Sequence, residues 1–322
     1  MEAIAQAQPN IALVKYWGKR REGSNVPATP SLSITLDSLW TRTRVRFDSA
    51  YERDRIVINE KSEPAQLERV ARCLDNIRRT TGTQLYADVE SRNNFPTGAG
   101  LASSASGFAA LVAAACSALG SDLDAGSQSR LARMSSASAA RSIFGGFVVL
   151  DNAGPDPAAT QLIGAHEWPL TVVVALTSTK SKSVGSTQGM VQSATTSDFY
   201  DAWTNSARHD FTAAREAVLS RDFQALAEIS EASCLKMHGV MLSTRPALVY
   251  WNGATVEIIH RVRDLRSRGT AVFFTIDAGP QVKIVAEPGA VDAIRHAIAD
   301  IPGVIDVVPG TLGAGARTIT RF

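Results

Sequence analysis

A run of small and apolar residues in the first half of the chain limits the possible folds more than any other feature. Residues 101–119 are small or apolar on nearly every side of a helix, and Gly120 then provides a stop signal. A helix with almost no polar face must be surrounded by protein. The sequence therefore predicts a helix buried at the centre of a domain, with the rest of that domain packed around it.

Segments with strand or helix periodicity lie on both sides of this run. In the N-terminal part, one helix begins near Pro64, and we expect strands at residues 31–36, 41–47, 56–58 and 84–89. The C-terminal part opens with a strand-like run, followed by two amphipathic helices and then helix, strand, strand, helix, strand. We place these elements at residues 171–176, 205–220, 222–237, 256–268, 272–276, 282–286, 290–300 and 304–308. This order is typical of an α+β fold with an antiparallel sheet.

Length and composition set the number of domains and the kinds of partner. With 322 residues, 45% of them hydrophobic, the chain is long enough for two domains, which we expect at residues 1–168 and 169–322. The 33 Lys and Arg nearly balance the 31 Asp and Glu, so we expect no nucleic-acid partner. The longest apolar run, residues 108–116, is shorter than the ~20 residues of a membrane span. We therefore expect no membrane partner. Three widely spaced cysteines fit buried free thiols, which favour a reducing compartment, so we expect a cytoplasmic protein.

A loop rich in glycine and serine, residues 94–107, leads into the buried helix. Small residues let a ligand approach the backbone, and free amides at the positive end of the helix dipole favour a bound phosphate. Ser103, Ser104 and Ser106 add hydroxyls that suit phosphate oxygens or Mg²⁺. The chain lacks the Gly-x4-Gly-Lys-Ser/Thr loop, and residues 98–100 lack the third glycine of the dinucleotide fingerprint. On its own, the loop is equally compatible with a glycine-rich turn that binds nothing.

An unusual group of side chains follows an apolar strand-like run near the N-terminus, in the sequence Pro9-Asn-Ile-Ala-Leu-Val-Lys-Tyr-Trp-Gly-Lys19. Lys15 and Lys19 are four residues apart, and together with Tyr16 they can clamp an anion. Lysines near an N-terminus are more often simply solvated. These residues alone therefore leave both interpretations open.

Several segments resemble motifs of known families. The loop Pro96-Thr-Gly-Ala-Gly-Leu-Ala-Ser-Ser-Ala105 resembles the ATP loop of the GHMP kinase superfamily, and the segment from Lys15 to Lys19 resembles the Lys-Tyr-Trp-Gly-Lys signature of the diphosphomevalonate decarboxylases. Further segments are similar to motifs of the same decarboxylases, in the family's order: Ser135-Ser-Ala-Ser-Ala-Ala-Arg-Ser-Ile-Phe-Gly-Gly146, Ser186-Thr-Gln-Gly-Met190 and Phe274-Thr-Ile-Asp-Ala-Gly-Pro280. The resemblance covers most of the chain.

This resemblance implies a GHMP-kinase-like α+β fold, with a ribosomal-protein-S5-like N-terminal ATP-binding domain, a ferredoxin-like C-terminal domain and a cleft between them. It implies ATP-dependent decarboxylation of mevalonate 5-diphosphate to isopentenyl diphosphate, a step of isoprenoid precursor synthesis, with ADP, phosphate and CO₂ as the other products. The reaction phosphorylates a tertiary hydroxyl and then loses phosphate and CO₂ to leave an alkene. ATP and Mg²⁺ are the implied cosubstrate and metal ion, phosphorylated mevalonate is the implied partner, and the implied assembly is a homodimer.

The resemblance also implies roles for single residues. Asp277 orients the hydroxyl and accepts its proton, Arg141 binds the substrate carboxylate through two hydrogen bonds, and Lys15 completes the catalytic set. The implied substrate-binding residues are Tyr16, Lys19, Ser136, Ser138, Ser186 and Thr187. The implied nucleotide-binding residues are Pro96, Gly98, Gly100, Leu101, Ala102, Ser103, Ser104 and Ser106, of which Ser104 and Ser106 are also the candidates for Mg²⁺. His238 resembles a family position too, but this chemistry needs no imidazole, so we expect a structural or pocket-wall role.

The chain departs from the family motif around Arg141. Ser135 and Ala137 stand where the family has glycines, Ala140 stands for a cysteine, and Gly98 stands for an alanine of the ATP loop. These changes leave other activities open: a decarboxylase or 3-kinase of mevalonate 5-phosphate, or a decarboxylase of a related 3-hydroxy acid. A non-catalytic nucleotide- or phosphate-binding module is the alternative from a different class. Retention of both Asp277 and the phosphate loop argues against it.

Overall fold

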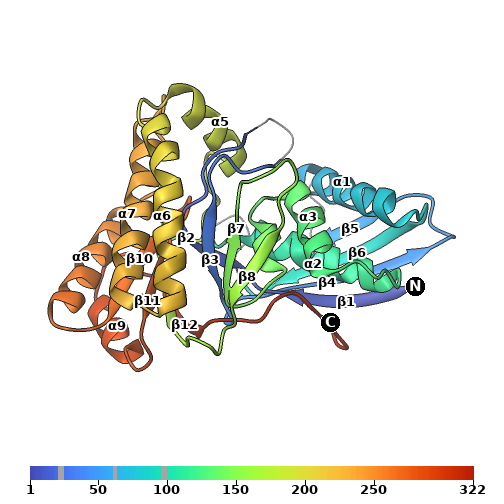
Figure 1. Ribbon diagram of the computed structural model, residues 1–322. Helices are drawn as coiled ribbons and strands as arrows, with labels where there is room; N and C mark the ends of the chain where they lie inside the picture. Colours follow the sequence, from blue (N-terminus) through green and yellow to red (C-terminus); the bar gives the residue numbers. More distant parts are fainter. Residues whose placement is uncertain (21–24, 61–63, 96–99) are drawn as a thin grey trace.

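The computed structural model describes residues 1–20, 25–60, 64–95 and 100–322. Figure 1 shows helices of the C-terminal half on one side, a small sheet in the middle, and a larger sheet with its helices on the other side. Helices and strands occur in both halves, which confirms the predicted α+β class. No helix within the described ranges has the length and apolar character needed to cross a bilayer. Pro96 and Gly98 of the predicted nucleotide loop lie outside the described residues.

The larger sheet joins both ends of the chain. Its strands, in spatial order, are β13 (Arg317–Ile319), β1 (Glu2–Ala7), β4 (Thr41–Asp48), β6 (Tyr86–Asn93) and β5 (Arg55–Ile58). Neighbouring strands are antiparallel except for β5 and β6. Along β4 the buried positions alternate with more exposed ones, so Val45 and Phe47 face the core. Because β13 pairs with β1, the last residues return to the N-terminal part of the molecule.

The buried helix predicted from residues 101–119 is confirmed as α2 (Ser103–Ala118). It shares a hydrophobic core with the larger sheet and with α1 (Pro64–Thr81), α3 (Ala125–Ser135) and the short α4 (Ala139–Ser142). Gly120 follows its end with a φ of 61°. Small side chains on every face of α2 allow these elements to approach it closely.

The remaining strands form two four-stranded antiparallel sheets. The middle sheet contains, in spatial order, β2 (Asn10–Val14), β3 (Ser31–Thr35), β7 (Phe147–Leu150) and β8 (Ala159–Ile163). The C-terminal sheet contains β10 (Val272–Ile276), β11 (Val282–Ala286), β9 (Thr171–Leu176) and β12 (Asp306–Thr311), antiparallel as predicted.

The C-terminal helices hold these two sheets together. Helices α6 (Tyr200–Ser220) and α7 (Phe223–Leu242) share one hydrophobic core with both sheets, whereas α8 (Gly253–Ser267) and α9 (Val291–Ile298) pack on the other face of the C-terminal sheet. Thr275 of β10 donates a hydrogen bond to the Ala12 carbonyl of β2 at 3.1 Å. The ends of β2 and β10 therefore lie side by side, although they are far apart in the sequence.

Candidate active site

A cavity of about 1550 Å³ is lined by residues from both halves of the chain. It collects most of the side chains singled out in the sequence. The predicted site residues that line it are Lys15, Tyr16, Lys19, Gly100, Ala102, Ser103, Ser104, Ser136, Ser138, Arg141, Ser186, Thr187 and Asp277. Five separate motifs thus meet at one place in the fold.

Asp277 and Lys15 form an ion pair at the wall of this cavity. Each follows the end of a strand, β10 and β2 respectively, and the Lys15 Nζ lies 2.6 Å from the Asp277 Oδ1. Lys15 is 1% exposed, whereas the Asp277 side chain is 24% exposed and opens onto the cavity. Burial favours the neutral form of Asp277, but Lys15, Lys283 and Arg141 outweigh it and hold the pKa of this carboxyl below its usual range. Asp277 is therefore an ionised carboxylate within reach of a ligand.

Arg141 lies on α4 and is 2% exposed. Its guanidinium donates to neutral partners: the Ser31 Oγ at 2.7 Å, the Ser33 Oγ at 3.0 Å and the Asn10 Oδ1 at 3.2 Å. No carboxylate of the described residues forms an ion pair with it. Burial lowers the pKa of Arg141 to about 10, against the opposing effect of Asp277, so the group stays charged at neutral pH. A buried cation that lacks a counter-ion is suited to an incoming anion.

Close backbone contacts hold the described end of the predicted nucleotide loop. Gly100 has a φ of 83°, and a Cβ atom on it would lie 3.0 Å from the Gly279 Cα, just beyond Asp277. Ala102 has a left-handed φ of 55° directly before α2. Ser103 and Ser104 then line the cavity in the first turn of α2. The free amides and the dipole of that turn favour a bound anion.

Two of the predicted nucleotide-binding side chains do not reach the cavity. Ser106 is fully buried, and its Oγ lies 2.7 Å from the Thr41 Oγ1 at the contact between α2 and β4. Leu101 is 2% exposed and packs into the core that the middle sheet shares with α6 and α7. The expectation that the Ser106 hydroxyl binds the nucleotide or Mg²⁺ is therefore corrected, because this hydroxyl is used in helix–sheet packing.

A row of serine hydroxyls runs along the cavity from α2 to α4. The Ser104 Oγ lies 3.4 Å from the Ser136 Oγ, which lies 3.1 Å from the Ser138 Oγ. Asn10 anchors the end of this row, since its Nδ2 donates to the Ser138 carbonyl at 2.8 Å and to the Ser142 Oγ at 2.7 Å. The row places hydroxyls between the start of α2 and α4, the helix that carries Arg141.

The departures from the family motif fall in two different environments. Ser135 and Ala137 line the cavity, so they can influence what binds there. Ala140 is fully buried and packs with Val148 and Leu150. The change at Ala140 therefore concerns core packing, not ligand contact.

Helix α5 (Ser186–Thr196) also lines the cavity. Trp17 fixes the segment between Lys15 and Lys19 against this helix, because its Nε1 donates to the Ser193 Oγ at 2.9 Å and its ring packs on Gly189. Ser186 and Thr187 line the cavity in the first turn of α5. Burial raises the pKa of Tyr16, so this phenol is a neutral hydrogen-bond donor.

Two lysines of the site were missed in the sequence. Lys182 lines the cavity, and its Nζ donates to the Ser186 Oγ at 2.7 Å; nothing in the surrounding polar loop marks it out. Burial lowers the pKa of Lys182, while Asp277 acts in the opposite direction. Lys283 is fully buried in β11, with its Nζ 3.8 Å from the Asp277 Oδ2. The sequence does contain a sign of this residue, because a lysine inside an apolar strand requires a polar partner.

His238 is buried behind the end of β10 and is not among the residues that line the cavity. The His238 Nε2 lies 3.3 Å from the Trp251 Nε1 and 3.4 Å from the Ile276 carbonyl oxygen, so protein groups surround it on both sides. Burial, reinforced by Lys15, lowers the pKa of His238 to about 3. The ring is therefore neutral at physiological pH, which fits the structural role expected from the sequence.

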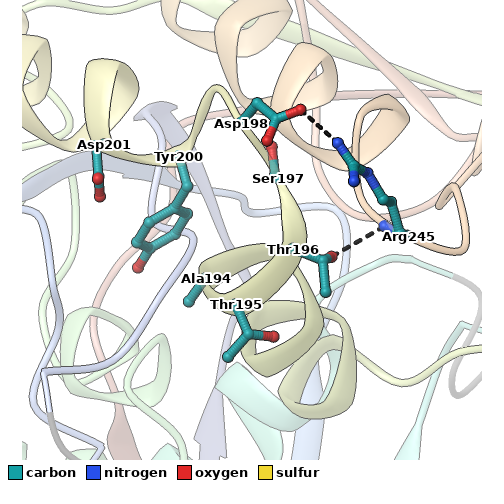
Figure 2. A pocket seen from close by; sticks show the side chains of 8 residues that line it. All are labelled: Ala194, Thr195, Thr196, Ser197, Asp198, Tyr200, Asp201 and Arg245. Atoms are coloured by element: carbon teal, nitrogen blue, oxygen red, sulfur yellow. Dashed lines mark hydrogen bonds and ion pairs between the residues drawn. The ribbon is translucent and has the colours of Figure 1, made fainter.

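A second hollow, of about 560 Å³, lies beside the end of α5 (Figure 2). Arg245 lines one edge of it, pairing with the Asp198 Oδ2 at 2.6 Å and donating its backbone N–H to the Thr196 Oγ1 at 2.9 Å. Both charged side chains are more than 70% exposed, and none of the predicted site residues lines this hollow. The large cavity is therefore the candidate active site.

The chain is similar to known proteins over most of its length. Residues 7–159 match the model of the diphosphomevalonate decarboxylase-like N-terminal domain, and residues 172–306 match that of the mevalonate 5-diphosphate decarboxylase C-terminal domain. The diphosphomevalonate decarboxylase of Candida albicans is 34% identical, over 98% of this chain and 97% of that protein.

Solved structures show the same likeness. A structure of MDDEF in complex with MVAPP, AMPPCP and magnesium is 38% identical and has a TM-score of 0.91, over 100% of this chain and 99% of that one. The mevalonate diphosphate decarboxylase of Staphylococcus aureus is 34% identical with a TM-score of 0.93, over 99% and 98% of the two chains. The expected GHMP-kinase-like two-domain fold is confirmed by these likenesses.

Proposed function

The chain belongs to the diphosphomevalonate decarboxylase family, and we propose that it converts mevalonate 5-diphosphate and ATP to isopentenyl diphosphate, ADP, phosphate and CO₂. It is an ATP-dependent decarboxylase of the mevalonate pathway. The observation that carries the proposal is the meeting of three charges in one cavity: the ionised Asp277, its partner Lys15 and the unpaired guanidinium of Arg141.

Asp277 accepts a hydrogen bond from the 3-hydroxyl of the substrate and takes its proton as the terminal phosphoryl group of ATP is transferred to that oxygen. Lys15 keeps the carboxylate ionised and holds one of its oxygens through the 2.6 Å contact. The other oxygen remains available to the hydroxyl. The first-formed product carries a phosphate on a tertiary carbon, and loss of this phosphate prepares the molecule for release of CO₂.

Arg141 binds the substrate carboxylate, which then serves as the counter-ion that the guanidinium lacks among the described residues. Its hydrogen bonds to Ser31 and Ser33 fix the plane of the guanidinium, so that the bond to CO₂ is held in one orientation. Ser136 and Ser138 line the same wall and donate hydroxyls to the carboxylate. A buried cation is costly, but this one is needed to neutralise the charge of the substrate carboxylate, which explains why it is retained.

The phosphates are divided between two helix starts. Gly100, Ala102, Ser103 and Ser104 bind those of ATP at the start of α2. Tyr16, Lys19, Ser186 and Thr187 bind the diphosphate of the substrate, and Lys182 adds a cation beside α5. Preorganised donors of this kind stabilise the charge that develops during phosphoryl transfer.

Mg²⁺ fits this site as an ion that is brought by ATP. In the described part of the chain, no group of three or more His, Cys, Asp or Glu side chains is arranged to hold a metal. Mg²⁺ binds substrate phosphates and keeps several waters, so a single protein hydroxyl is sufficient. Ser104 would provide it, and the bound ion would neutralise phosphate charge during transfer.

Three further proposals concern the assembly, the cellular location and the domain division of the protein. We propose a homodimer, which light scattering tests directly. We also propose a cytoplasmic enzyme, which is supported by three buried cysteines that form no disulfide. The proposed domain division is an ATP-binding domain over residues 1–168 and a second domain over residues 169–322.

The proposed reaction is tested by its stoichiometry. With ATP, Mg²⁺ and mevalonate 5-diphosphate, the protein should release ADP, phosphate and CO₂ in equal amounts. Release of ADP without CO₂ would identify a kinase that stops at the phosphorylated intermediate. Absence of all three products would refute the proposed function.

A further inference from the structure

Lys283 is a buried charge that the reaction described above does not use. It lies in β11 between apolar neighbours, has no exposed surface and is not among the residues that line the cavity. A buried ammonium is costly unless it is paired and hydrogen-bonded. Its contacts should therefore explain why a lysine occupies this position.

The Lys283 ammonium contacts two parts of the site at once. Its Nζ donates to the Gly100 carbonyl at 2.9 Å and lies 3.8 Å from the Asp277 Oδ2. The first contact joins β11 to the nucleotide loop, and the second joins it to the carboxylate oxygen that Lys15 does not hold. One side chain thus links the ATP-binding backbone to the base.

The contact with Gly100 also fixes the direction of a loop peptide. In a trans peptide the carbonyl and the next amide point in opposite directions. A carbonyl that is directed at Lys283 therefore turns the Leu101 amide away from it. Gly100 itself lines the cavity, with its Cα packed against Gly279, so little freedom remains at this end of the loop.

Positive charge is in excess around Asp277. The titratable and charged groups that act on this carboxylate or lie near it come from five elements: Lys15 after β2, Arg141 on α4, Lys182 before α5, Cys234 and His238 on α7, and Lys283 on β11. Cys234 and His238 are neutral, because burial raises the thiol pKa to about 11 and lowers the imidazole pKa to about 3. Lysines and Arg141 therefore set the charge state of Asp277.

We propose that Lys283 is a positioning residue that couples the nucleotide loop to the catalytic base, by holding the Gly100 carbonyl and the Asp277 carboxylate with one ammonium. This inference rests on the proposed function, because it assumes that Asp277 is the base and that the loop binds ATP. It predicts two separate effects of Lys283. The ammonium orients the loop, which affects the KM for ATP, and it keeps Asp277 ionised, which affects the pH profile.

The test replaces Lys283 with side chains that lack the charge. Lys283→Met removes the hydrogen bond to Gly100, and the KM for ATP should rise roughly tenfold or more, as expected for a lost bond from a charged donor. It also removes a cation near Asp277, so the pKa of that carboxyl should rise by roughly 1 to 3 units. The acidic limb of the pH profile of kcat, measured with both substrates saturating, should move to higher pH by the same amount.

Lys283→Gln separates the two effects. It lacks the charge, so its acidic limb should move as in Lys283→Met, while its amide retains a donor on the side of Gly100 and should raise the KM for ATP less. Lys236→Met is the matched control, because Lys236 pairs with Asp210 outside the cavity. Its KM for ATP and its pH profile should match those of the unaltered enzyme. If Lys283→Met does not fold, the acidic limb of Lys283→Gln decides the question.

A folded Lys283 variant that is slower at every pH, with an unmoved acidic limb, would show that the lysine only supports the fold and would overturn the proposal. So would an unchanged KM for ATP in Lys283→Met. These results concern Lys283 alone when the unaltered enzyme releases CO₂. An unaltered enzyme that releases none would instead refute the proposed function.

Discussion

Replacement of Arg141 by glutamine should remove activity without loss of stability, which is unusual for a buried arginine. Burial lowers the pKa of Arg141 to about 10. A lowering of roughly 2.5 units from the ordinary value corresponds to about 3 kcal/mol, at 1.36 kcal/mol per unit. Because the folded-state pKa of this base is depressed, the penalty is present at every pH below about 10 and disappears only above it.

Arg141→Gln relieves this penalty and retains amide donors for the hydroxyls of Ser31 and Ser33. We therefore expect the free energy of unfolding of the unliganded protein to stay the same or to increase by about 1 kcal/mol, after the loss of packing is subtracted. The loss of a charged contact with the substrate carboxylate costs about 2 to 5 kcal/mol. At 1.4 kcal/mol per factor of ten, kcat/KM for mevalonate 5-diphosphate should fall by roughly 30- to several thousand-fold.

Urea unfolding at pH 7.5 without ligands and CO₂ release under the same buffer conditions measure the two quantities. Arg78→Gln is the matched control, because Arg78 does not line the cavity and forms a buried ion pair with Asp54, besides a second pair with the exposed Asp75 at the cavity wall. That change should cost about 3 to 5 kcal/mol of stability and leave kcat/KM unchanged. Equal destabilisation of the two variants, with unchanged turnover in Arg141→Gln, would refute the reasoning.

Three further predictions concern other parts of the site. Asp277→Asn should lower ADP formation by roughly 10²- to 10⁴-fold while ATP affinity, measured by calorimetry, stays nearly intact; loss of ATP binding instead would mean that Asp277 is structural. Lys19→Ala should reduce the preference for mevalonate 5-diphosphate over the monophosphate in parallel turnover assays, and an unaltered preference would place diphosphate recognition elsewhere. His238 has a folded-state pKa of about 3, below that of the unfolded chain, so urea unfolding should show stability falling as the pH drops from about 6.5 toward 4. His238→Gln should flatten this acid dependence, and an unchanged slope would contradict a buried neutral imidazole.

The parts of the fold that sequence predicts well are those with a strong local pattern. Helix α2 is apolar on nearly every face, so its central position follows from the sequence alone. Strands β10 and β11 were predicted at residues 272–276 and 282–286, where the structure has them. By contrast, β1 contains three alanines and little β propensity, and it is a strand because it lies between β4 and β13. That pairing depends on residues from the opposite end of the chain.

The site divides in the same way. Motif resemblance identified Lys15, Arg141 and Asp277, and the structure brings them to one cavity. Ser106 was grouped with Ser104, although residues two apart on a helix point in directions about 160° apart; helical geometry already separates them. Lys283 was missed because its partners, Gly100 and Asp277, reach it through sheet pairing and loop packing. A lone lysine in an apolar strand indicates a buried partner but does not identify it.

The central claim is tested most directly by CO₂ and ADP release from mevalonate 5-phosphate and mevalonate 5-diphosphate, measured side by side with ATP and Mg²⁺. In the proposed reaction Asp277 is the base, Arg141 is the carboxylate anchor, and the cavity residues around Lys19 and α5 bind a second group of phosphates. The protein should therefore release equal amounts of ADP and CO₂, with a higher kcat/KM for the diphosphate. ADP release without CO₂, or a higher kcat/KM for the monophosphate, would contradict the account.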